Sequence, residues 1–508
     1  MHAYYPSIFN DVIGPVMRGS SSSHVAAAHR IGALARDYMQ GDFNTVLIEY
    51  DINGSLGPTH ESQGSDMGLF AGLMGWEVTD ARMVEAGAHL RQAGCQVEIR
   101  VHDYQAVHPN TYKLTLSNAR DSCCFIAIST GGGMIEVTEI NDYKLSLFGD
   151  YFETLIEGAP ASLKGSLEGD HVLARKGPTG TLLQIKSQAP IENLDPLIGY
   201  KVRTLAPVLP IGARKNMTVP FADSEELIAF NADKRLEMWE LALLYESARG
   251  NIAEGIVYDK MRDIVRILEK SIAEGIEGTS YVDRIYPAQA PAFKEKMASN
   301  TFLNLGLSND VILAVTALMD VKSAMGVIVA APTAGSCGTL PGTCIGAANA
   351  LNLSEDKKIK AMLAAGLIGV FIAQKATFSA ELGGCQAETG SGSGMAAAAL
   401  ITLLGGSFNQ TLSAASMALQ NTFGLVCDPV ANRVEAPCLG KNVLMAGNAL
   451  SAANMALAGF DALIPLDEVI VAMHQVGQAI PCELRCTGKG GLATTPTAQR
   501  IFKELNAG

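Results

Sequence analysis

Hydrophobic and polar positions follow two different periods along the chain. In the first third, short runs rich in β-branched and aromatic residues are separated by turn residues, which is typical of strands. Stretches with helical spacing of Ala, Leu, Ile and Met lie between these runs. The expected strands are residues 44–50, 96–101, 112–117 and 124–137, and the expected helices are 22–40 and 64–75. This mixture predicts an α/β domain over residues 1–190.

From residue 226 onward the pattern is helical, and Ala and Gly dominate the expected helices. A proline-rich stretch, 191–225, precedes them and is expected to be a connecting segment. We therefore expect the α+β class, with an N-terminal α/β domain followed by an all-α catalytic domain over residues 226–508. The expected helices are 233–248, 252–275, 308–326, 357–378, 394–405, 411–424, 441–458 and 466–478.

Composition narrows the classes of function. A length of 508 residues predicts two or three domains, and a net charge of −13 argues against nucleic acid or an anionic membrane as a partner. The stretch from Thr389 to Cys427 has no charged side chain, but Gly, Ser, Asn and Gln interrupt it too often for a membrane span. The N-terminus has no basic region followed by an apolar stretch. We expect a soluble, cytoplasmic protein.

Three cysteines lie in unusual small-residue contexts, at Cys385, Cys427 and Cys438. Ten cysteines in a chain that is not exported indicate reduced thiols or metal ligands. Three thiolates on an iron–sulfur cluster would leave one iron open to a substrate, as in catalytic metal sites. Their spacing is not that of a compact ferredoxin run. A structural zinc site therefore stays open as an alternative, although the isolated cysteines fit zinc modules poorly.

A turn with polar side chains follows the apolar run 327–330 and leads into another expected helix. Amides and hydroxyls at such a helix start suit a carboxylate, whereas the simpler reading is a tight connection with a capping serine. The four residues predicted to bind the substrate, through its carboxylate, are Thr333, Ala334, Gly335 and Ser336.

Three histidines lie in Ser-, Asn- and Gly-rich loops of the N-terminal domain. His24 follows a serine cluster that can bind an anion or cap a helix. His60 and His108 lie in loops next to expected strands, where each taken singly is an ordinary structural residue. The candidates for proton transfer are His24, His60 and His108, and the candidates for substrate binding are Ser21, Ser22, Ser23, Asn53, Ser55 and Asn110. The glycine triple 131–133 indicates a tight turn, because the dinucleotide-binding pattern around it is absent.

These motifs, taken together and in this order, resemble those of the iron–sulfur-dependent L-serine dehydratases over nearly the whole chain. The N-terminal part resembles the β domain of that family and the C-terminal part resembles its α domain. The motifs that carry the resemblance are Ser21-Ser22-Ser23-His24, Asn53-Gly54-Ser55, His108-Pro109-Asn110-Thr111, Pro332-Thr333-Ala334-Gly335-Ser336, Gly383-Gly384-Cys385-Gln386-Ala387-Glu388, Cys427-Asp428-Pro429-Val430, Pro437-Cys438 and Gly490-Gly491-Leu492-Ala493.

The resemblance implies a function and a cofactor. Cys385, Cys427 and Cys438 would bind a [4Fe–4S] cluster whose fourth iron takes L-serine, while the 333–336 turn helps to hold the carboxylate. The reaction would be a β-elimination that gives pyruvate and ammonia, with oxygen inactivating the enzyme. The small amino acid would be the only partner besides a second copy of the chain, in a homodimer.

Departures from the family pattern leave the substrate and the base open. The family motif Gly-His-Gly-Thr-Asp corresponds here to Ser62-Gln63-Gly64-Ser65-Asp66, so Gln63 stands where the family has a histidine. His60, three residues earlier, is the candidate to replace that histidine. Ser20 replaces a proline. The chain ends without the cysteine that closes the resting cluster in some members, so Cys482, Cys486 or water would take that place. Another β-substituted amino acid such as L-cysteine, or a non-catalytic amino-acid-binding relative, remains an alternative.

Overall fold

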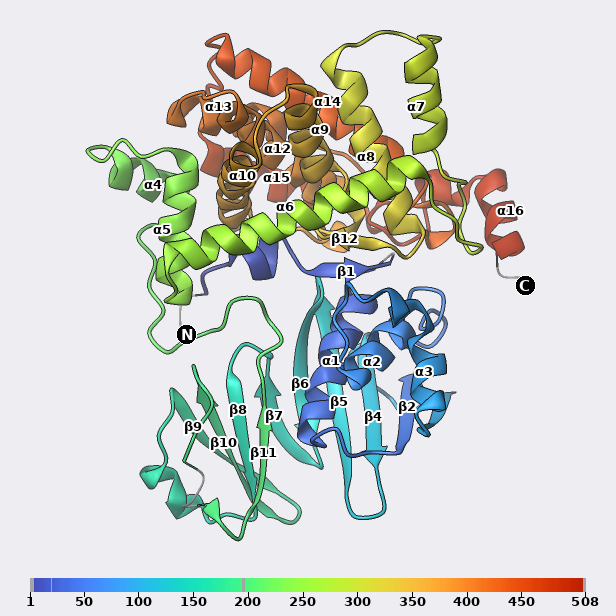
Figure 1. The fold of residues 1–508 in the computed structure, drawn as a ribbon, viewed down its shortest axis with the longest axis vertical. Helices are drawn as coiled ribbons and strands as arrows, with labels where there is room; N and C mark the ends of the chain where they lie inside the picture. Colours follow the sequence, from blue (N-terminus) through green and yellow to red (C-terminus); the bar gives the residue numbers. More distant parts are fainter. Residues whose placement is uncertain (1–3, 20, 194–196, 506–508) are drawn as a thin grey trace. The chain divides into compact units, whose positions relative to one another are not determined.

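The computed structural model describes residues 4–19, 21–193 and 197–505. Contacts divide the chain into two compact units. The first, called here the sheet unit, is Ser21–Met217. The second, called here the helical unit, is Thr218–Gly508 together with the N-terminal segment that ends at Ser20. The α+β class predicted from the sequence is confirmed (Figure 1).

The larger sheet of the sheet unit has six strands in the order β3-β2-β4-β5-β6-β7. Strands β2 and β3 run parallel, and the other neighbouring pairs are antiparallel. Helix α1 packs on α2 so closely that a Cβ on Gly32 would lie 2.4 Å from the Leu69 carbonyl oxygen, so this contact needs glycine. The elements are α1 (Val25–Tyr38), β2 (Thr45–Asp51), α2 (Ser65–Met74), a 3₁₀ turn (Ala81–Glu85), α3 (Ala86–Gln92), β3 (Gln96–His102), β4 (Thr111–Ser117), β5 (Ser122–Gly131), β6 (Met134–Ile140) and β7 (Tyr143–Leu147).

The smaller sheet has four antiparallel strands in the order β11-β8-β10-β9. Its core is apolar and includes Ile156, Leu183 and Ile185. The elements are β8 (Phe152–Glu157), a 3₁₀ turn (Ala161–Ser166), β9 (His171–Gly177), β10 (Gly180–Ser187) and β11 (Lys201–Leu205).

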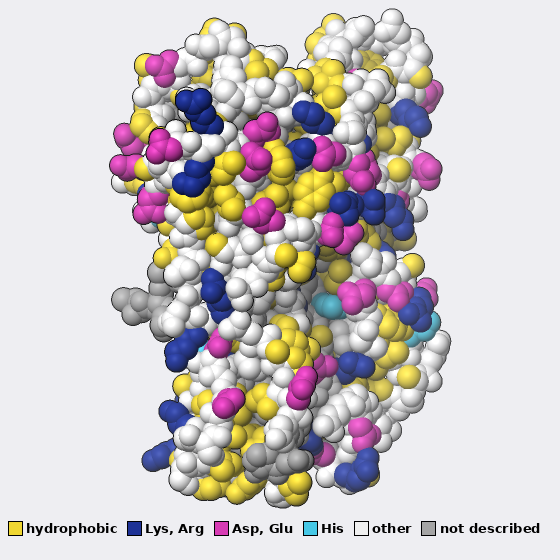
Figure 2. All heavy atoms as spheres, turned by 60° about the vertical axis from the view of Figure 1, so that its left-hand side comes forward, with side chains coloured by type: hydrophobic (Ala, Val, Ile, Leu, Met, Phe, Trp, Pro, Cys, Tyr) yellow, Lys and Arg dark blue, Asp and Glu magenta, His cyan; other side chains and the backbone are white. Residues whose placement is uncertain are grey.

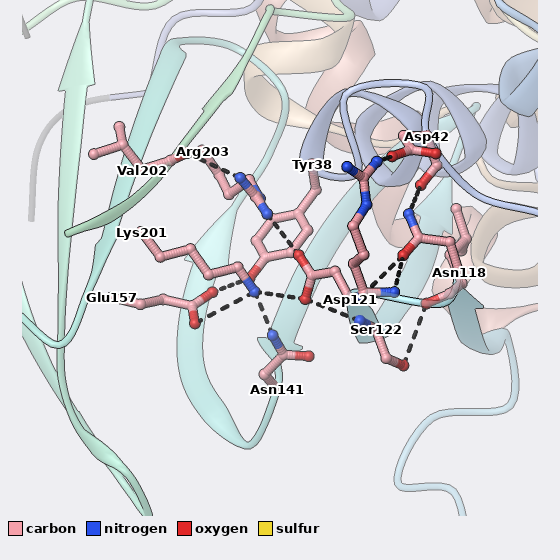
Figure 3. A network of polar contacts seen from close by, with 12 residues as sticks. Tyr38, Asp42, Asn118, Asp121, Ser122, Asn141, Glu157, Lys201, Val202 and Arg203 are labelled. Atoms are coloured by element: carbon pink, nitrogen blue, oxygen red, sulfur yellow. Dashed lines mark hydrogen bonds and ion pairs between the residues drawn. The ribbon is translucent and has the colours of Figure 1, made fainter. Parts of the chain in front are cut away.

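A polar network joins the two sheets of this unit (Figure 3). Asp121, just before β5, accepts from Lys201 Nζ at 2.9 Å and from Arg203 at 2.5 Å, and both of these cations lie on β11. Tyr38 of α1 donates to Glu157 of β8 and accepts from the Asn141 amide at 3.0 Å. The sheets are therefore fixed to each other by charged hydrogen bonds as well as by the chain.

The helical unit is built on small residues. Helix α12 is almost wholly buried, α10 is buried over residues 361–372, and Ala and Gly allow the two helices to pack closely. The N-terminal segment joins this unit through strand β1 (Val16–Arg18), which pairs antiparallel with β12 (Val327–Val329). The α-helices are α4 (Ser224–Asn231), α5 (Met238–Gly250), α6 (Glu254–Glu277), α7 (Ala290–Ser299), α8 (Leu307–Ser323), α9 (Thr339–Ala350), α10 (Glu355–Lys375), α11 (Ala380–Gly383), α12 (Ser391–Leu403), α13 (Phe408–Gln420), α14 (Cys438–Leu457), α15 (Leu466–Ala479) and α16 (Pro496–Leu505).

The structure differs from the expected boundaries at two places. The N-terminal segment was expected in the α/β domain, but the pairing of β1 with β12 joins it to the helical unit. The stretch 191–225 was expected to be a connection, but it contains β11, which pairs with β8. Both contacts are between distant parts of the chain, so the local pattern does not reveal them. Ser20 and residues 506–508, which bear on the family comparison, lie outside the described residues.

Two further features of the fold are the hydropathy of the described helices and the charge of one face of the surface. None of the described helices combines the length and the apolar character that crossing a bilayer requires. On the face drawn in Figure 2, acidic and basic side chains are interspersed.

Candidate active-site residues

Two of the three predicted cysteine ligands come together in the helical unit. The Sγ atoms of Cys385 and Cys427 and a carboxylate oxygen of Glu388 all lie within 4.8 Å of one another. Gly384, just before Cys385, has a φ of +71°, and a Cβ there would lie 2.8 Å from the Leu425 carbonyl oxygen. Glycine at this position therefore lets Cys385 approach the segment that carries Cys427.

Cys438 is the first residue of α14 and is buried. Burial, and then the charge of Cys385, raise the pKa of its thiol, so the two sulfurs interact. One helical turn later, the amide of Asn442 donates at 2.8 Å to the Cys438 carbonyl and also at 2.8 Å to the Gly335 carbonyl. The third predicted cysteine is thus held next to the predicted 333–336 turn.

A further cysteine meets this cluster from near the C-terminus. The Cys427 amide donates to the Leu484 carbonyl, and the Cys486 amide donates to the Cys427 carbonyl, both at 2.8 Å. Hydrogen bonds with the thiols of Cys385 and Cys486, together with burial, raise the pKa of Cys427. Cys482 is exposed. Of the two cysteines considered as a fourth ligand, the fold brings Cys486 to the cluster.

Lys441 places a positive charge beside the sulfurs. Its Nζ lies 3.8 Å from Cys385 Sγ and donates to Asp428 Oδ1 at 2.7 Å. Burial lowers the pKa of Lys441, but Cys385 and Asp428 raise it more, so the ammonium stays charged. Sequence reasoning missed both Lys441 and Glu388. Each lies three residues after a predicted cysteine, a spacing that places the two side chains on one face of a helical segment.

The hydroxyls of the 333–336 turn are engaged within the protein. Thr333 Oγ1 donates to Glu388 Oε1 at 2.8 Å and caps the turn by accepting from the Ser336 amide at 3.3 Å. The Ser336 hydroxyl donates to the Ala331 carbonyl at 3.3 Å. Burial, and then the charge of Glu381, raise the pKa of Glu388 to about 7. The turn is thus a tight connection capped by its own side chains, and through Glu388 it also lies next to the cysteine cluster.

The donor set suits a metal bound by thiolates. Cys438 begins a long helix, and Cys385 precedes the helical segment that continues into α12. Amides and the positive dipole at a helix N-terminus stabilise a thiolate, as does the nearby Lys441 ammonium. Soft sulfur ligands select zinc, copper(I) and iron–sulfur clusters over magnesium or calcium.

In the sheet unit, His60 is held by a carboxylate. Its Nδ1 lies 2.6 Å from Asp66 Oδ2, and its ring stacks on Tyr50 at 4.9 Å between ring centroids. Tyr50 in turn donates to Asp66 Oδ1 at 3.1 Å. The hydrogen bond that His60 donates to Asp66 raises the pKa of His60, against the effect of burial. Within the part of the chain that the structure describes, no hydrogen-bond partner meets His60 Nε2, so this nitrogen is available for proton exchange.

His24 is a neutral histidine with both ring nitrogens engaged. Its Nδ1 lies 2.9 Å from Ser21 Oγ, and its Nε2 lies 3.0 Å from Thr59 Oγ1. Burial lowers its pKa to about 4. Ser22 beside it is buried, and the Ser23 carbonyl accepts from the Tyr112 hydroxyl at 3.3 Å. Because the ring is already bonded on both sides, His24 suits a fixed polar contact better than a proton shuttle.

The remaining predicted residues of this unit lie in two loops bound to each other. The Ser55 hydroxyl donates to Asn110 Oδ1, and the Ser55 amide donates to the Pro109 carbonyl at 2.9 Å. His108 accepts at its Nδ1 from the Asn110 amide at 3.1 Å. The Asn53 side chain is exposed. The structure therefore gathers Ser55, His108 and Asn110 beside the loop that carries Thr59.

Comparison with known proteins decides the family. The profile described as "Serine dehydratase alpha chain" matches residues 233–493, about half of the chain. The chain belongs to the serine dehydratase family. Its relatives include the "Probable L-serine dehydratase, alpha chain" of Bacillus subtilis (strain 168), which is 38% identical over 288 residues, or 57% of this chain and 96% of that protein.

Two further relatives are a separate beta chain and an L-serine dehydratase whose name mentions no alpha or beta chain. The "Probable L-serine dehydratase, beta chain" of the same organism is 38% identical over 152 residues, 30% of this chain and 68% of that protein. This single serine dehydratase polypeptide therefore joins counterparts of two separate chains. The "L-serine dehydratase 1" of Escherichia coli (strain K12) is 31% identical over 281 residues, 54% of this chain and 62% of that protein. Dehydratases are lyases, so the chain is a member of an enzyme family of this class.

Proposed function

We propose that the protein is an L-serine dehydratase that converts L-serine to pyruvate and ammonia with a [4Fe–4S] cluster. One observation carries the proposal: the thiols of Cys385 and Cys427 converge with Glu388 in a chain whose relatives bear the name L-serine dehydratase. A homodimer, which the family resemblance implies, and a cytoplasmic location, expected from the composition and the N-terminal residues, stay predictions.

Cys385, Cys427 and Cys438 would hold the cluster. When bound, such a cluster supplies a Lewis acid that assists departure of the β-hydroxyl group. Lys441 keeps a positive charge at 3.8 Å from Cys385 Sγ, which favours the thiolate over the thiol. Burial of all three cysteines excludes bulk water from the sulfurs.

His60 is the residue that we propose to accept the α-proton. Asp66 holds the Nδ1 side of the ring, which leaves Nε2 as the acceptor in the neutral tautomer. A raised pKa also brings the base closer to neutral pH, where general-base catalysis is most efficient. Gln63, which replaces the family histidine, cannot accept a proton. His24 and His108 are proposed to contact polar groups of the substrate instead.

The chemistry balances without a further reactant. Loss of the α-proton and of hydroxide from L-serine releases water and leaves an enamine. This enamine tautomerises to an imine, which a second water hydrolyses to pyruvate and ammonia. L-Cysteine would give the same enamine with release of hydrogen sulfide instead, so the substrate must be determined by measurement.

The test is an anaerobic assay of the purified, reconstituted protein. Iron and acid-labile sulfide are measured first, and then keto-acid release from L-serine, L-threonine and L-cysteine. Pyruvate from L-serine that is lost on exposure to air supports the proposal. A protein that carries zinc and no iron contradicts the cofactor, and a full cluster that binds L-serine without turnover indicates an amino-acid-binding relative.

A further inference from the structure

Lys322 is a fully buried lysine in the last turn of α8. Its Nζ donates to the carbonyl oxygen of Val434. A lysine ammonium has three N–H donors, so one carbonyl satisfies only part of it. Among the residues that the structure describes, no carboxylate lies within 4.0 Å of this ammonium.

Among the described residues, the other buried lysines, Lys186 and Lys358, and the half-buried Lys441 are paired. Lys186 lies 2.7 Å from Glu153, Lys358 lies 2.5 Å from Glu269 and Lys441 lies 2.7 Å from Asp428. An unpaired charge in a protein interior is expensive, because it loses its hydration without gaining an opposite charge. The negative end of the α8 dipole offsets only part of this loss. Within the described part of the chain, Lys322 is therefore a buried cation with a carbonyl partner but without a carboxylate partner.

The ammonium lies next to the cysteine cluster. Val434, whose carbonyl it contacts, is four residues before Cys438. A Cβ on Gly335 would lie 3.3 Å from Val434 Cγ1 and 3.0 Å from Glu388 Oε1, so Val434 and Glu388 border the same small space. Burial raises the pKa values of Cys438 and Glu388, and the positive charge of Lys322 opposes this rise at both groups. Lys322 is thus close enough to Cys438 and Glu388 for its charge to act on both groups.

A cluster held by the three nearby thiolates would supply an anion in this neighbourhood. The thiolates carry more negative charge than the iron–sulfide core offsets, so the bound cluster is anionic overall. Lys441, which also faces Cys385, already has a carboxylate partner in Asp428. Lys322 is the buried cation of this neighbourhood whose charge no described carboxylate cancels.

We propose that Lys322 is the buried counter-cation of the metal centre, where its ammonium offsets the charge of the cluster held by Cys385, Cys427 and Cys438. This proposal rests on the proposed function, because it requires the cluster. Lys322 is a positioning residue and does not take part in proton transfer. Its charge stabilises the loaded protein over the apoprotein and favours the more negative, reduced state of the cluster.

The test compares Lys322→Met with the wild-type protein, both as apoprotein and after anaerobic loading with iron and sulfide. Methionine keeps most of the apolar stem and removes the charge. We expect the apoprotein of the variant to melt at or above the wild-type temperature, because an uncompensated buried charge is gone. Loading should raise its Tm by several degrees less than it raises that of the wild type. The reduction midpoint, followed by the EPR signal of the reduced cluster, should shift to more negative potential.

Lys358→Met is the matched control, because it removes a buried lysine that already has a carboxylate partner. It should lower the Tm of both forms alike and leave the midpoint unchanged. Lys322→Arg keeps the charge and should return the midpoint toward that of the wild type; if Lys322→Met does not fold, Lys322→Gln replaces it. An equal gain in Tm on loading and an unchanged midpoint overturn the inference. Absence of iron from the loaded wild type overturns the proposed function itself, so the two failures are distinguishable.

Discussion

Asp66→Asn tests how the proposed base is held. The carboxylate of Asp66 lies 2.6 Å from His60 Nδ1, and both side chains are mostly buried. Asparagine keeps the shape but not the charge, and it can present an amide N–H where His60 needs an acceptor. A hydrogen bond to a charged group contributes roughly 1.5–3 kcal/mol. At about 1.4 kcal/mol for each factor of ten, loss of this bond predicts a roughly 10- to 100-fold fall in kcat/KM.

The pH dependence of kcat/KM shows in which direction Asp66→Asn moves the pKa of the base. A general base must be neutral, so kcat/KM falls as the pH drops through the pKa of the base in the free enzyme. Asp66 raises the pKa of His60 in the wild type, chiefly through the hydrogen bond. The variant loses this contribution while burial still lowers the pKa. The acidic limb of the profile should therefore move to lower pH even though the maximum falls.

The assay is pyruvate release from L-serine by the reconstituted variant between pH 5 and 9, with iron content measured in each preparation. Tyr50→Phe is the matched control, because it removes the hydroxyl that donates to Asp66 but keeps the ring that stacks on His60. It should change kcat/KM by a smaller factor than Asp66→Asn. An acidic limb that stays in place in Asp66→Asn, with full iron content, refutes the assignment of His60 as the base.

Three further predictions concern the metal centre and the sheet unit. Cys427→Ala should abolish both iron binding and pyruvate release, since two thiolates hold a cubane poorly; retained activity with iron would contradict the ligand assignment. Cys486→Ser should lose iron in air several-fold faster than Cys482→Ser, because Cys486 contacts Cys427 whereas Cys482 is exposed; equal rates would separate Cys486 from the cluster. Asp121→Asn should lower the free energy of unfolding by about 1–2 kcal/mol at pH 7, because it breaks two partly buried ion pairs. Burial alone raises the pKa of Asp121, but Lys201 and Arg203 lower it more, so this loss should shrink as the pH falls below about 4 and the wild-type carboxyl becomes protonated. A loss independent of pH in urea denaturation would contradict the ion-pair account.

Periodic segments were predicted best. The amphipathic pattern at 252–275 corresponds to α6 at Glu254–Glu277, because one apolar face repeats over six turns of helix. Helix α9, Thr339–Ala350, follows the 333–336 turn as expected, but its bounds were not predicted: it is buried on nearly all sides and rich in Gly, Thr and Ala, so it has no polar face that would give a period. The β-rich run 124–137 contains parts of two strands, β5 and β6, joined by the tight turn that was predicted at the glycine triple 131–133.

By itself the sequence determined the class of the fold, the three cysteines of the proposed metal centre and the histidine-bearing loops, since each depends on local spacing or on a short motif. Only the tertiary structure decided which side chains act on these groups. Asp66 reaches back to His60, Lys441 to Cys385 and Cys486 to Cys427, and Lys322 lies on α8, which packs on the helix that begins at Cys438. A local pattern of residues indicates which face of a helix or strand is apolar. The distances between segments far apart in the chain, and the pKa values that depend on them, are set only when the chain folds.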